Sequence, residues 1–559
     1  GILAQQNERP ASPDAASRNR LTTFRELESD MIDRRSILGG AMLGAGALGI
    51  AAYAGRDLLI GKKATLASGT ARSQLLIPPL YSGERDSGER VFDLNLRHGV
   101  SQFFDGLETP TIGINQSYLG PTLEMYAGDT VRMNVTSDLS ETATVHWHGF
   151  HLPARADGGP HQPIEPGGSW TARFDVRQRA SMFWYHSHAH RRSGPQVYQG
   201  LAGMIYVRDS ASEALDLPND YGVDDIPLVV QDRAFARDGS LIYSTRMHNV
   251  MMGMMGDTML VNGIVEPVFE AKSDRLRLRL VNGSNARFYR FGFDDGRSFH
   301  QIGTDGGLLA APLPTDNVVL APGERAQVIV DVSDGRPVSL LADGLEIMGM
   351  GNRGRGMRGP GPMRDSDRPT DNWMMGERER RDGMMGGMMD ERRRFTVLDI
   401  RPAASRRRAI AMPRQLATLP QIDPGDAVRT RRFVLDMGMG MRMMRGGGFT
   451  INGKSMDMQR IDETVRVNTT EIWQVENASM MAHPFHIHDV QFRILDRNGR
   501  APEAAEQGLK DTVVVYPGET VRLLLRFEDY TDPDLPYMYH CHILEHEDAG
   551  MMGQFTVTA

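Results

Sequence analysis

The sequence has almost no cysteine, since Cys541 is the only one among 559 residues. A single thiol cannot form a disulfide within the chain, so disulfides do not hold this fold together. Cys541 stands between two histidines in the segment HCHILEHEDAGMM, which begins at His540. The thiol must therefore have a role other than cross-linking.

The chain also lacks an excess of positive charge. It has 63 Lys and Arg against 71 Asp and Glu, a net charge of -8 and a pI near 6.1. This balance gives no electrostatic reason to expect a nucleic acid as a partner. A chain of 559 residues is too long for one core and should divide into roughly three or four domains of about 150 residues.

Long apolar runs are missing as well. A weakly apolar run, LGGAMLGAGALGIAAYAG, follows Arg34 and Arg35, is short for a membrane span, and contains the small-x-small pattern of a signal peptidase site at residues 52–54. A paired arginine before such a run resembles a twin-arginine export signal. We therefore expect residues 1–54 to be an N-terminal extension and export segment, and the protein to be periplasmic without stable membrane insertion after processing. An uncleaved N-terminal anchor is the alternative.

Short runs rich in Val, Thr, Phe and Leu dominate the chain beyond residue 85. Their polarity alternates, as in TVRMNV, WTARFDV, RLRLRLV and TVRLLLRF, and PGG, PGE, NG and DG turn signals separate them. Alternation between closely spaced turns is typical of β-strands that have one buried face. The pattern predicts an all-β sandwich fold.

The runs recur in the same order, which indicates internal repeats. VRMNVTS precedes HWHG at His146, and EIWQVEN precedes HIHD at His486, both 340 residues further on. PGGSWTARF and PGETVRLLL likewise lead to YHSH and YHCH. A middle copy carries RLRLRLVNGS and PGERAQVIVDV, but FGF at residues 291–293 replaces the HxH motif. We predict three domains, at 85–212, 213–402 and 403–559, with the middle one as a spacer.

Four HxH pairs stand at equivalent positions in the first and third copies. Side chains at i and i+2 on a strand point to the same face, so each pair can aim two imidazoles at one point. A single pair could be two surface histidines, but four equivalent pairs predict a metal cluster, and eight imidazoles suit copper. The pairs are His146 and His148, His186 and His188, His486 and His488, and His540 and His542.

Strand parity separates a second site from this cluster. Cys541 lies between two of the histidines and points to the opposite face, and His483 has the opposite parity to His486. His546 adds a second imidazole and Met551 a weak thioether. One thiolate, two imidazoles and a long axial methionine form the ligand set of a blue-copper site.

HWHG, HSH, HPFHIH and HCH-x3-H-x4-M together resemble the four copper motifs of the multicopper oxidases, and the resemblance covers nearly the whole chain from residue 85. It implies three cupredoxin-like Greek-key β-sandwich domains in one chain, with a copper-free middle domain and four copper ions. The implied ligands are His483, Cys541, His546 and Met551 for type 1 copper, His146 and His486 for type 2 copper, and His148, His186 and His542 with His188, His488 and His540 for the type 3 pair.

The resemblance also implies a reaction. Reducing O2 to water takes four electrons, whereas a phenol or Cu(I) supplies one at a time, so four coppers can store the electrons. The backbone of Cys541 is then a short route to His540 and His542. Asp157 and Glu547 match family positions that assist proton delivery, although either could be only a solvated or turn carboxylate.

Six further histidines show no spacing that demands a metal, and we expect structural or surface roles for them. They are His98, His151, His161, His190, His248 and His300.

The 35 methionines are clustered, with six in residues 247–259, ten in 348–389 and five in 437–444. Their neighbours are Gly, Arg, Asp and Pro, so a hydrophobic core does not explain them. Thioether sulfur suits Cu(I), and a Met-rich insert at 345–394 resembles the periplasmic cuprous oxidases of copper efflux. Asp436 and Asp548 are candidates to help hold a substrate copper. A disordered linker or an oxidant scavenger is the alternative.

The favoured function is oxidation of Cu(I) to Cu(II) with O2, for copper tolerance, by a monomer. One alternative is a broad laccase that oxidises phenols or aromatic amines. A non-enzyme copper store or copper-free scaffold is the other, but members of that kind have lost ligands and all twelve are present here.

Overall fold

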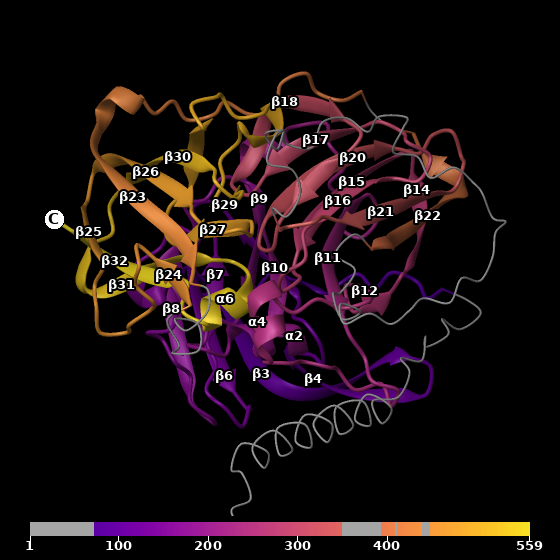
Figure 1. Cartoon of the computed structure of the whole chain (residues 1–559). Helices are drawn as coiled ribbons and strands as arrows, with labels where there is room; N and C mark the ends of the chain where they lie inside the picture. The colour runs from indigo at the N-terminus through magenta and orange to yellow at the C-terminus, as the bar shows by residue number, and fades with distance from the viewer. Residues whose placement is uncertain (1–71, 349–392, 409–410, 439–447) are drawn as a thin grey trace, which may run out of the picture. The chain divides into compact units, whose positions relative to one another are not determined.

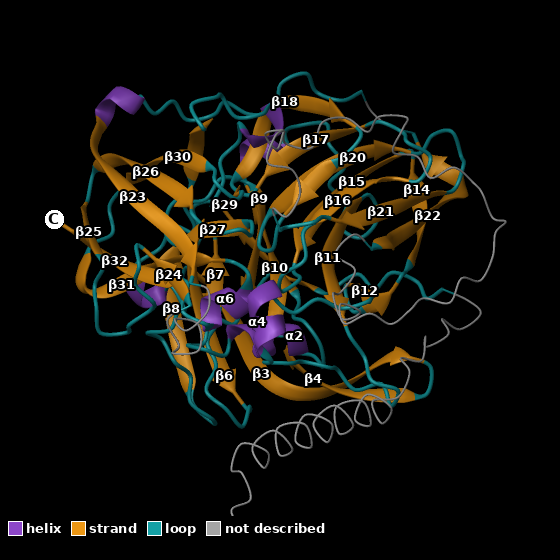
Figure 2. Ribbon diagram, in the orientation of Figure 1, coloured by secondary structure: helices purple, strands orange, loops and turns teal. Residues whose placement is uncertain are grey.

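The computed structural model describes residues 72–348, 393–408, 411–438 and 448–559. These residues all belong to one structural unit, Thr65–Ala559. Strands make up nearly all of their regular structure, as the alternating runs predict (Figure 2). The expected export segment, most of the Met-rich insert and the methionines at 439–444 lie outside the described residues.

Two sheets form from residues 80–208. One has the strand order β1-β5-β10-β9-β7, and the other has β2-β3-β6-β8 with β4 paired to β3. Apolar side chains from both, such as Leu94, Val135 and Ile205, share one buried core. The strands are β1 (Leu80–Tyr81), β2 (Glu84–Asp86), β3 (Glu89–Phe104), β4 (Leu107–Ile114), β5 (Thr122–Tyr126), β6 (Thr130–Ser137), β7 (His146–His148), β8 (Ser169–Asp175), β9 (Ser181–His186) and β10 (Ala202–Arg208).

Residues 225–407 form a second pair of sheets. Their orders are β13-β12-β11-β15-β20-β17-β18 and β14-β22-β21-β16-β19. The strands are β11 (Asp225–Arg233), β12 (Thr258–Val261), β13 (Ile264–Val265), β14 (Val268–Ser273), β15 (Arg275–Asn282), β16 (Tyr289–Phe293), β17 (Phe299–Thr304), β18 (Gly307–Thr315), β19 (Val318–Leu320), β20 (Arg325–Asp331), β21 (Val338–Gly344) and β22 (Arg394–Arg407).

The third pair of sheets comes from residues 427–558, coloured orange to yellow in Figure 1. Their orders are β24-β23-β26-β30-β28 and β25-β32-β31-β27-β29. The strands are β23 (Ala427–Met437), β24 (Phe449–Ile451), β25 (Glu463–Arg466), β26 (Thr469–Asn477), β27 (His483–Ile487), β28 (Phe492–Arg497), β29 (Thr512–Val515), β30 (Thr520–Phe527), β31 (Asp532–Cys541) and β32 (Met552–Thr558).

The three sheet pairs repeat one topology. In the first, β10 runs parallel to β5 and antiparallel to β9, and β9 is antiparallel to β7. In the middle copy, β22 is parallel to β14 and antiparallel to β21, and β21 is antiparallel to β16. In the third copy, β32 is parallel to β25 and antiparallel to β31, and β31 is antiparallel to β27. The strands β16 and β27 are therefore the equivalents of β7. At this place the middle copy buries Phe291 and Phe293 in its own core. The predicted domain boundaries themselves stay predictions.

The described helices are all short. They are α2 (Ser193–Gln199), α3 (Ser210–Glu213), α4 (Met247–Met252) and α6 (Leu544–Asp548), with 3-10 turns η1 (Ala154–Ala156), η3 (Pro424–Asp426) and η4 (Ala504–Glu506). Both α2 and α4 contact α6 (Figure 2). None of the helices in the described ranges has the length and apolar character to cross a membrane.

Candidate metal centre

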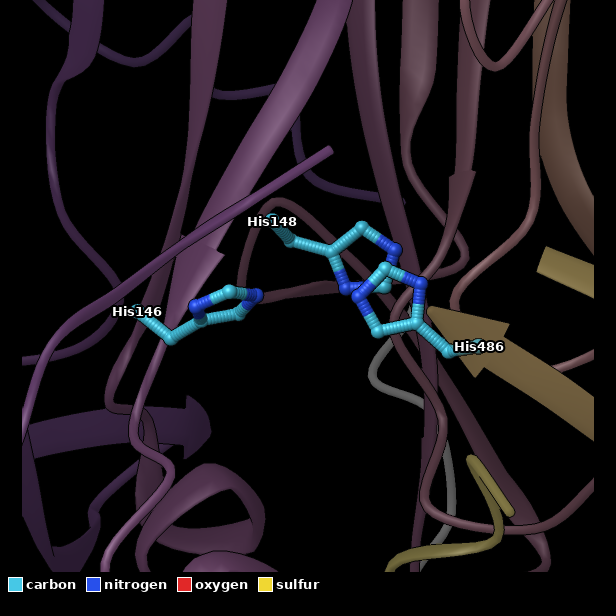
Figure 3. A group of neighbouring side chains, drawn as sticks. All are labelled: His146, His148 and His486. Carbon is cyan, nitrogen blue, oxygen red and sulfur yellow. The ribbon is translucent and has the colours of Figure 1, made fainter. Parts of the chain in front are cut away.

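The eight histidines of the HxH pairs come together in one buried cluster. Each has 1% or less of its surface exposed. Strand pairing sets His146 opposite His186 and His486 opposite His540. The ring of His148 stacks on that of His486 with centroids 3.7 Å apart, and His146 stacks on His488 at 3.8 Å. Figure 3 shows rings from β7 and β27 converging, so the first and third sheet pairs build the cluster jointly.

The ring nitrogens fall into groups with a spacing that a metal ion could bridge. Within each group one nitrogen per residue lies within 4.8 Å of the others. The groups are His146, His148 and His486; His148, His186 and His542; and His188, His488 and His540. The last two contain the same residues as the two type 3 sets that the resemblance implies.

Unpartnered nitrogens show that this cluster fits metal ions. Nε2 of His146, Nε2 of His486 and both nitrogens of His542 are buried and have no hydrogen-bond partner among the described residues. Buried polar atoms in native proteins are nearly always paired. Burial lowers the pKa of His540 to about 3, and the pKa of His542 also lies well below its usual value. The imidazoles of His540 and His542 are therefore neutral near pH 7, which is the form that binds metal.

Burial has the same effect on other members of the cluster. Together with the charges of neighbouring imidazoles, it lowers the pKa well below the usual value in His148, His186, His188, His486 and His488.

Asp157 and Glu547 both contact the cluster. Oδ2 of Asp157 lies 2.8 Å from Nδ1 of His488, and its backbone oxygen lies 2.9 Å from Nδ1 of His146. The Glu547 carboxylate lies 3.2 Å from Nδ1 of His188 and 3.3 Å from Nδ1 of His540. Burial raises the pKa of Glu547 well above its usual value, and the Asp548 charge adds to this. Glu547 is thus placed to hold a proton beside two imidazoles.

Asp511 is a third carboxylate at the cluster. Its Oδ1 lies 3.0 Å from Nε2 of His148, and its backbone oxygen lies 2.8 Å from Nδ1 of His486. Arg325 of the middle sheet pair donates two hydrogen bonds to this carboxylate. Spacing along the sequence does not identify Asp511 or Arg325 as part of the site, because their contacts exist only in the folded chain.

Cys541 lies in a separate group with His483 and His546. Its Sγ is 3.5 Å from Nδ1 of His483 and 3.6 Å from Nδ1 of His546. The far nitrogens are held elsewhere, since Nε2 of His483 lies 2.8 Å from Ser479 Oγ and Nε2 of His546 lies 2.9 Å from the Met251 carbonyl. These contacts turn both Nδ1 atoms toward the sulfur.

The thiol environment favours a metal ligand. Burial raises the pKa of the Cys541 thiol, and burial lowers the pKa of His546 to about 4. A bound cation would displace the thiol proton. Met551 is fully buried in the same core, and its backbone oxygen accepts a hydrogen bond from the Cys541 amide. His540 and His542 belong to the eight-histidine cluster, whereas Cys541 between them belongs to the other group. The side chains along HCH therefore alternate between two faces of the strand, as its geometry predicts.

The other candidate residues take different places. Among the described residues, none of the six remaining histidines joins a metal-sized group. His151 pairs with Asp489 and Asp529, and His161 Nε2 lies 2.8 Å from Gln554 Oε1. His98 and His248 are exposed, whereas His190 and His300 are half-buried.

The two aspartates suggested for substrate copper also have defined places. Asp548 accepts hydrogen bonds from the backbone amides of Ser193 and Gly194 at the start of α2. Asp436 lies on β23 opposite Thr450.

Comparisons with known proteins agree with this geometry. Residues 96–212 and 413–559 each match the family described as multicopper oxidase. The multicopper oxidase mco of Staphylococcus haemolyticus is 32% identical over 500 residues, which cover 88% of this chain and 94% of that protein. The cell division protein FtsP of Yersinia pestis is 33% identical over 536 residues, which cover 94% of this chain and 99% of that one.

Solved structures are similar over most of the chain. CueO, a laccase-like multicopper oxidase from a lignin-degrading Ochrobactrum species, is 33% identical with a TM-score of 0.73, covering 87% of this chain and 100% of that one. A Campylobacter jejuni multicopper oxidase described as a metallo-oxidase is 26% identical with a TM-score of 0.72, covering 88% and 96%. The family uses O2 and a reducing substrate. This chain, with its repeated cupredoxin-like fold, belongs to the multicopper oxidase family and is an oxidase.

Proposed function

We propose that this protein oxidises Cu(I) to Cu(II) and uses the electrons to reduce O2 to water, for copper tolerance in the periplasm. The observation that carries the proposal is the cover over His546. Its outer nitrogen bonds the Met251 carbonyl, so α4, with Met247, Met251 and Met252, lies against the ligand edge where electrons would enter. Three methionines belong to α4, and soft thioethers suit Cu(I) better than a bulky aromatic substrate.

Four copper ions are proposed, in the ligand sets that the sequence motifs imply. His483, Cys541, His546 and Met551 would hold type 1 copper. Type 2 copper would bind His146 and His486, and the type 3 pair would bind His148, His186 and His542 with His188, His488 and His540. When bound, copper supplies one-electron redox chemistry and stores the four electrons that O2 requires.

The chain itself supplies a covalent route for electrons and acids that can deliver protons. The backbone on either side of Cys541 joins the thiolate site covalently to His540 and His542. Glu547 holds a proton between His188 and His540, and Ser193 Oγ donates to its carboxylate. Asp157 keeps Nδ1 of His488 engaged, which leaves Nε2 to face the cluster. We propose both acids as proton donors during O2 reduction.

Location and assembly are part of the same proposal. The paired arginines before a weakly apolar run support export by the twin-arginine route. A periplasmic monomer would meet Cu(I) that has entered the envelope.

A laccase is the second candidate. The Ochrobactrum relative is described as active toward lignin model compounds and lignosulfonate, whereas the Campylobacter relative is described as a metallo-oxidase. The cover over His546 favours the metallo-oxidase function here, because a phenol would have to displace or bypass α4.

Steady-state O2 consumption by copper-loaded protein distinguishes the two. Cu(I) and a bulky phenol are compared, each with and without added Cu(II). We expect fast turnover of Cu(I), and phenol turnover that stays weak until Cu(II) is added. Strong phenol turnover that is indifferent to Cu(II), with slow Cu(I) turnover, would contradict the proposal and favour the laccase.

A further inference from the structure

The middle sheet pair has no histidine pair, yet one of its turns reaches the eight-histidine cluster. This turn, residues 322–325, has the sequence PGER and leads into β20. Gly323 adopts φ +85°, and a β-carbon there would come within 2.8 Å of the His542 ring. The turn therefore packs directly on a histidine of the cluster and leaves no room for a larger side chain.

Arg325, the last residue of this turn, makes a two-point contact with Asp511 through both terminal nitrogens of its guanidinium. Nη1 donates to Oδ1 at 2.7 Å and Nη2 to Oδ2 at 2.6 Å, and both side chains are fully buried. The guanidinium also donates to the backbone oxygens of Gly323 and Asp305. A two-point contact fixes the plane of the carboxylate, which a single hydrogen bond would not.

Asp511 in turn sets the orientation of His148. Its Oδ1 lies 3.0 Å from Nε2 of His148, and the Thr512 hydroxyl donates to the same oxygen at 2.9 Å. Because Oδ1 already accepts hydrogen bonds from Arg325 and Thr512, it faces His148 as an acceptor, and Nε2 is the ring nitrogen that donates to it. The lone pair of Nδ1 is then directed into the cluster, where Nδ1 lies 3.3 Å from Nε2 of His186.

The surrounding charges leave Arg325 as the direct counter-charge of Asp511. Lys510 is close in sequence, but its Nζ pairs with Asp305 at 2.9 Å and with Glu324 at 3.1 Å. Without Arg325, the buried Asp511 carboxylate would have no Lys or Arg of the described residues against it, which is strongly unfavourable. The pair therefore cannot lose one member without disturbing the contact to His148.

We propose that Arg325 is a positioning residue of the metal cluster, holding His148 through Asp511. The middle domain is then a structural part of the cluster that the first and third domains build. This inference rests on the proposed function, because it assumes that His148 binds copper. Outer partners of metal-bound histidines fix ring orientation and affinity in general.

Three variants test the inference. Arg325→Leu removes the contact to Asp511. Arg325→Lys keeps the positive charge but not the two-point contact. Asp511→Asn replaces the carboxylate with an amide of similar size. The matched control is Arg279→Lys, because Arg279 also makes a buried two-point contact, at 2.6 and 2.7 Å, to Asp225 within the middle sheet pair.

The readouts are bound copper per chain at graded free copper, the EPR signal of type 2 copper, the near-ultraviolet absorption of the type 3 pair, and the blue absorption of the type 1 site. We expect Arg325→Leu and Asp511→Asn to bind cluster copper roughly 10- to 100-fold more weakly, with altered EPR and an unchanged blue site. Arg325→Lys should lie in between, and Arg279→Lys should match the wild type.

Wild-type copper affinity and EPR in Arg325→Lys and Asp511→Asn would overturn the inference, even if Arg325→Leu failed to fold. The same loss in the Arg279→Lys control would also overturn it, because general destabilisation would then explain the result. A wild-type protein that binds no copper at the histidine cluster would instead overturn the proposed function, and this inference with it.

Discussion

At the residue scale, burial gives the candidate ligands their chemistry. Water is excluded from Cys541 and from all eight clustered histidines. Burial lowers the pKa of seven of these histidines and raises that of the thiol, which therefore keeps its proton until a cation binds. Two acidic side chains contact these histidines. Asp157 and Glu547 contact different imidazoles, so their proposed roles as proton donors can be tested separately by mutation.

Asp157→Asn tests the proton-donor role at this scale. The substitution keeps the side-chain size but removes the acid, so we expect O2 consumption to slow by roughly 100-fold or more. The blue absorption should stay, because Cys541 belongs to a different group. The matched control is Asp175→Asn on the exposed edge of β8. O2 turnover that is unchanged in Asp157→Asn would contradict the role.

At the element scale, contacts between distant segments hold the two histidine motifs together. His151 follows β7 and Asp489 follows β27, and their side chains meet at 2.7 Å although the residues are 338 positions apart. The other ring nitrogen of His151 lies 2.9 Å from Asp529, which Arg177 also contacts. This contact ties the loop after the first motif to the loop after the third.

The His151 contact makes stability depend on pH. Burial alone would lower the pKa of His151, but Asp489, followed by the more distant Glu528 charge, raises it above the usual 6.5. A group with a raised folded-state pKa stabilises fully below its unfolded pKa, and this contribution is lost as the pH rises through the folded-state value.

We therefore expect metal-free His151→Asn to be less stable than the wild type by about 1–3 kcal/mol, the usual cost of removing a buried hydrogen-bond partner, at a pH below about 6. The difference should shrink as the pH rises through the folded-state pKa. Urea denaturation at several pH values measures it, and His98→Asn, at an exposed position on β3, is the control. A difference that does not change with pH would contradict the assignment.

At the scale of the whole molecule, much of the fold follows from local pattern. Alternating polarity and repeated turn signals predict the strands, and strand parity predicts that Cys541 and His483 separate from the eight clustered histidines. These features depend only on neighbours along the chain. The absence of a histidine pair in the middle copy is also predictable from the sequence. Its FGF segment places buried phenylalanine rings where the other copies have HxH.

Contacts between the domains are not predictable in this way. Arg325 and Asp511 are 186 residues apart, and the Met251 carbonyl lies 295 residues from His546. Neither contact has a periodicity or motif, since each depends on how three separate cores pack together. The carboxylate behind His148 and the cover over His546 are for this reason visible only in the structure.

The most direct test of the account is the copper content and spectrum of the loaded protein beside its Cys541→Ser variant. We predict four coppers and blue absorption in the wild type. Cys541→Ser should keep three coppers and the type 2 EPR signal, lose the blue absorption, and no longer oxidise Cu(I). Blue absorption that survives in Cys541→Ser, or a wild type that binds copper at only one of the two sites, would contradict the account.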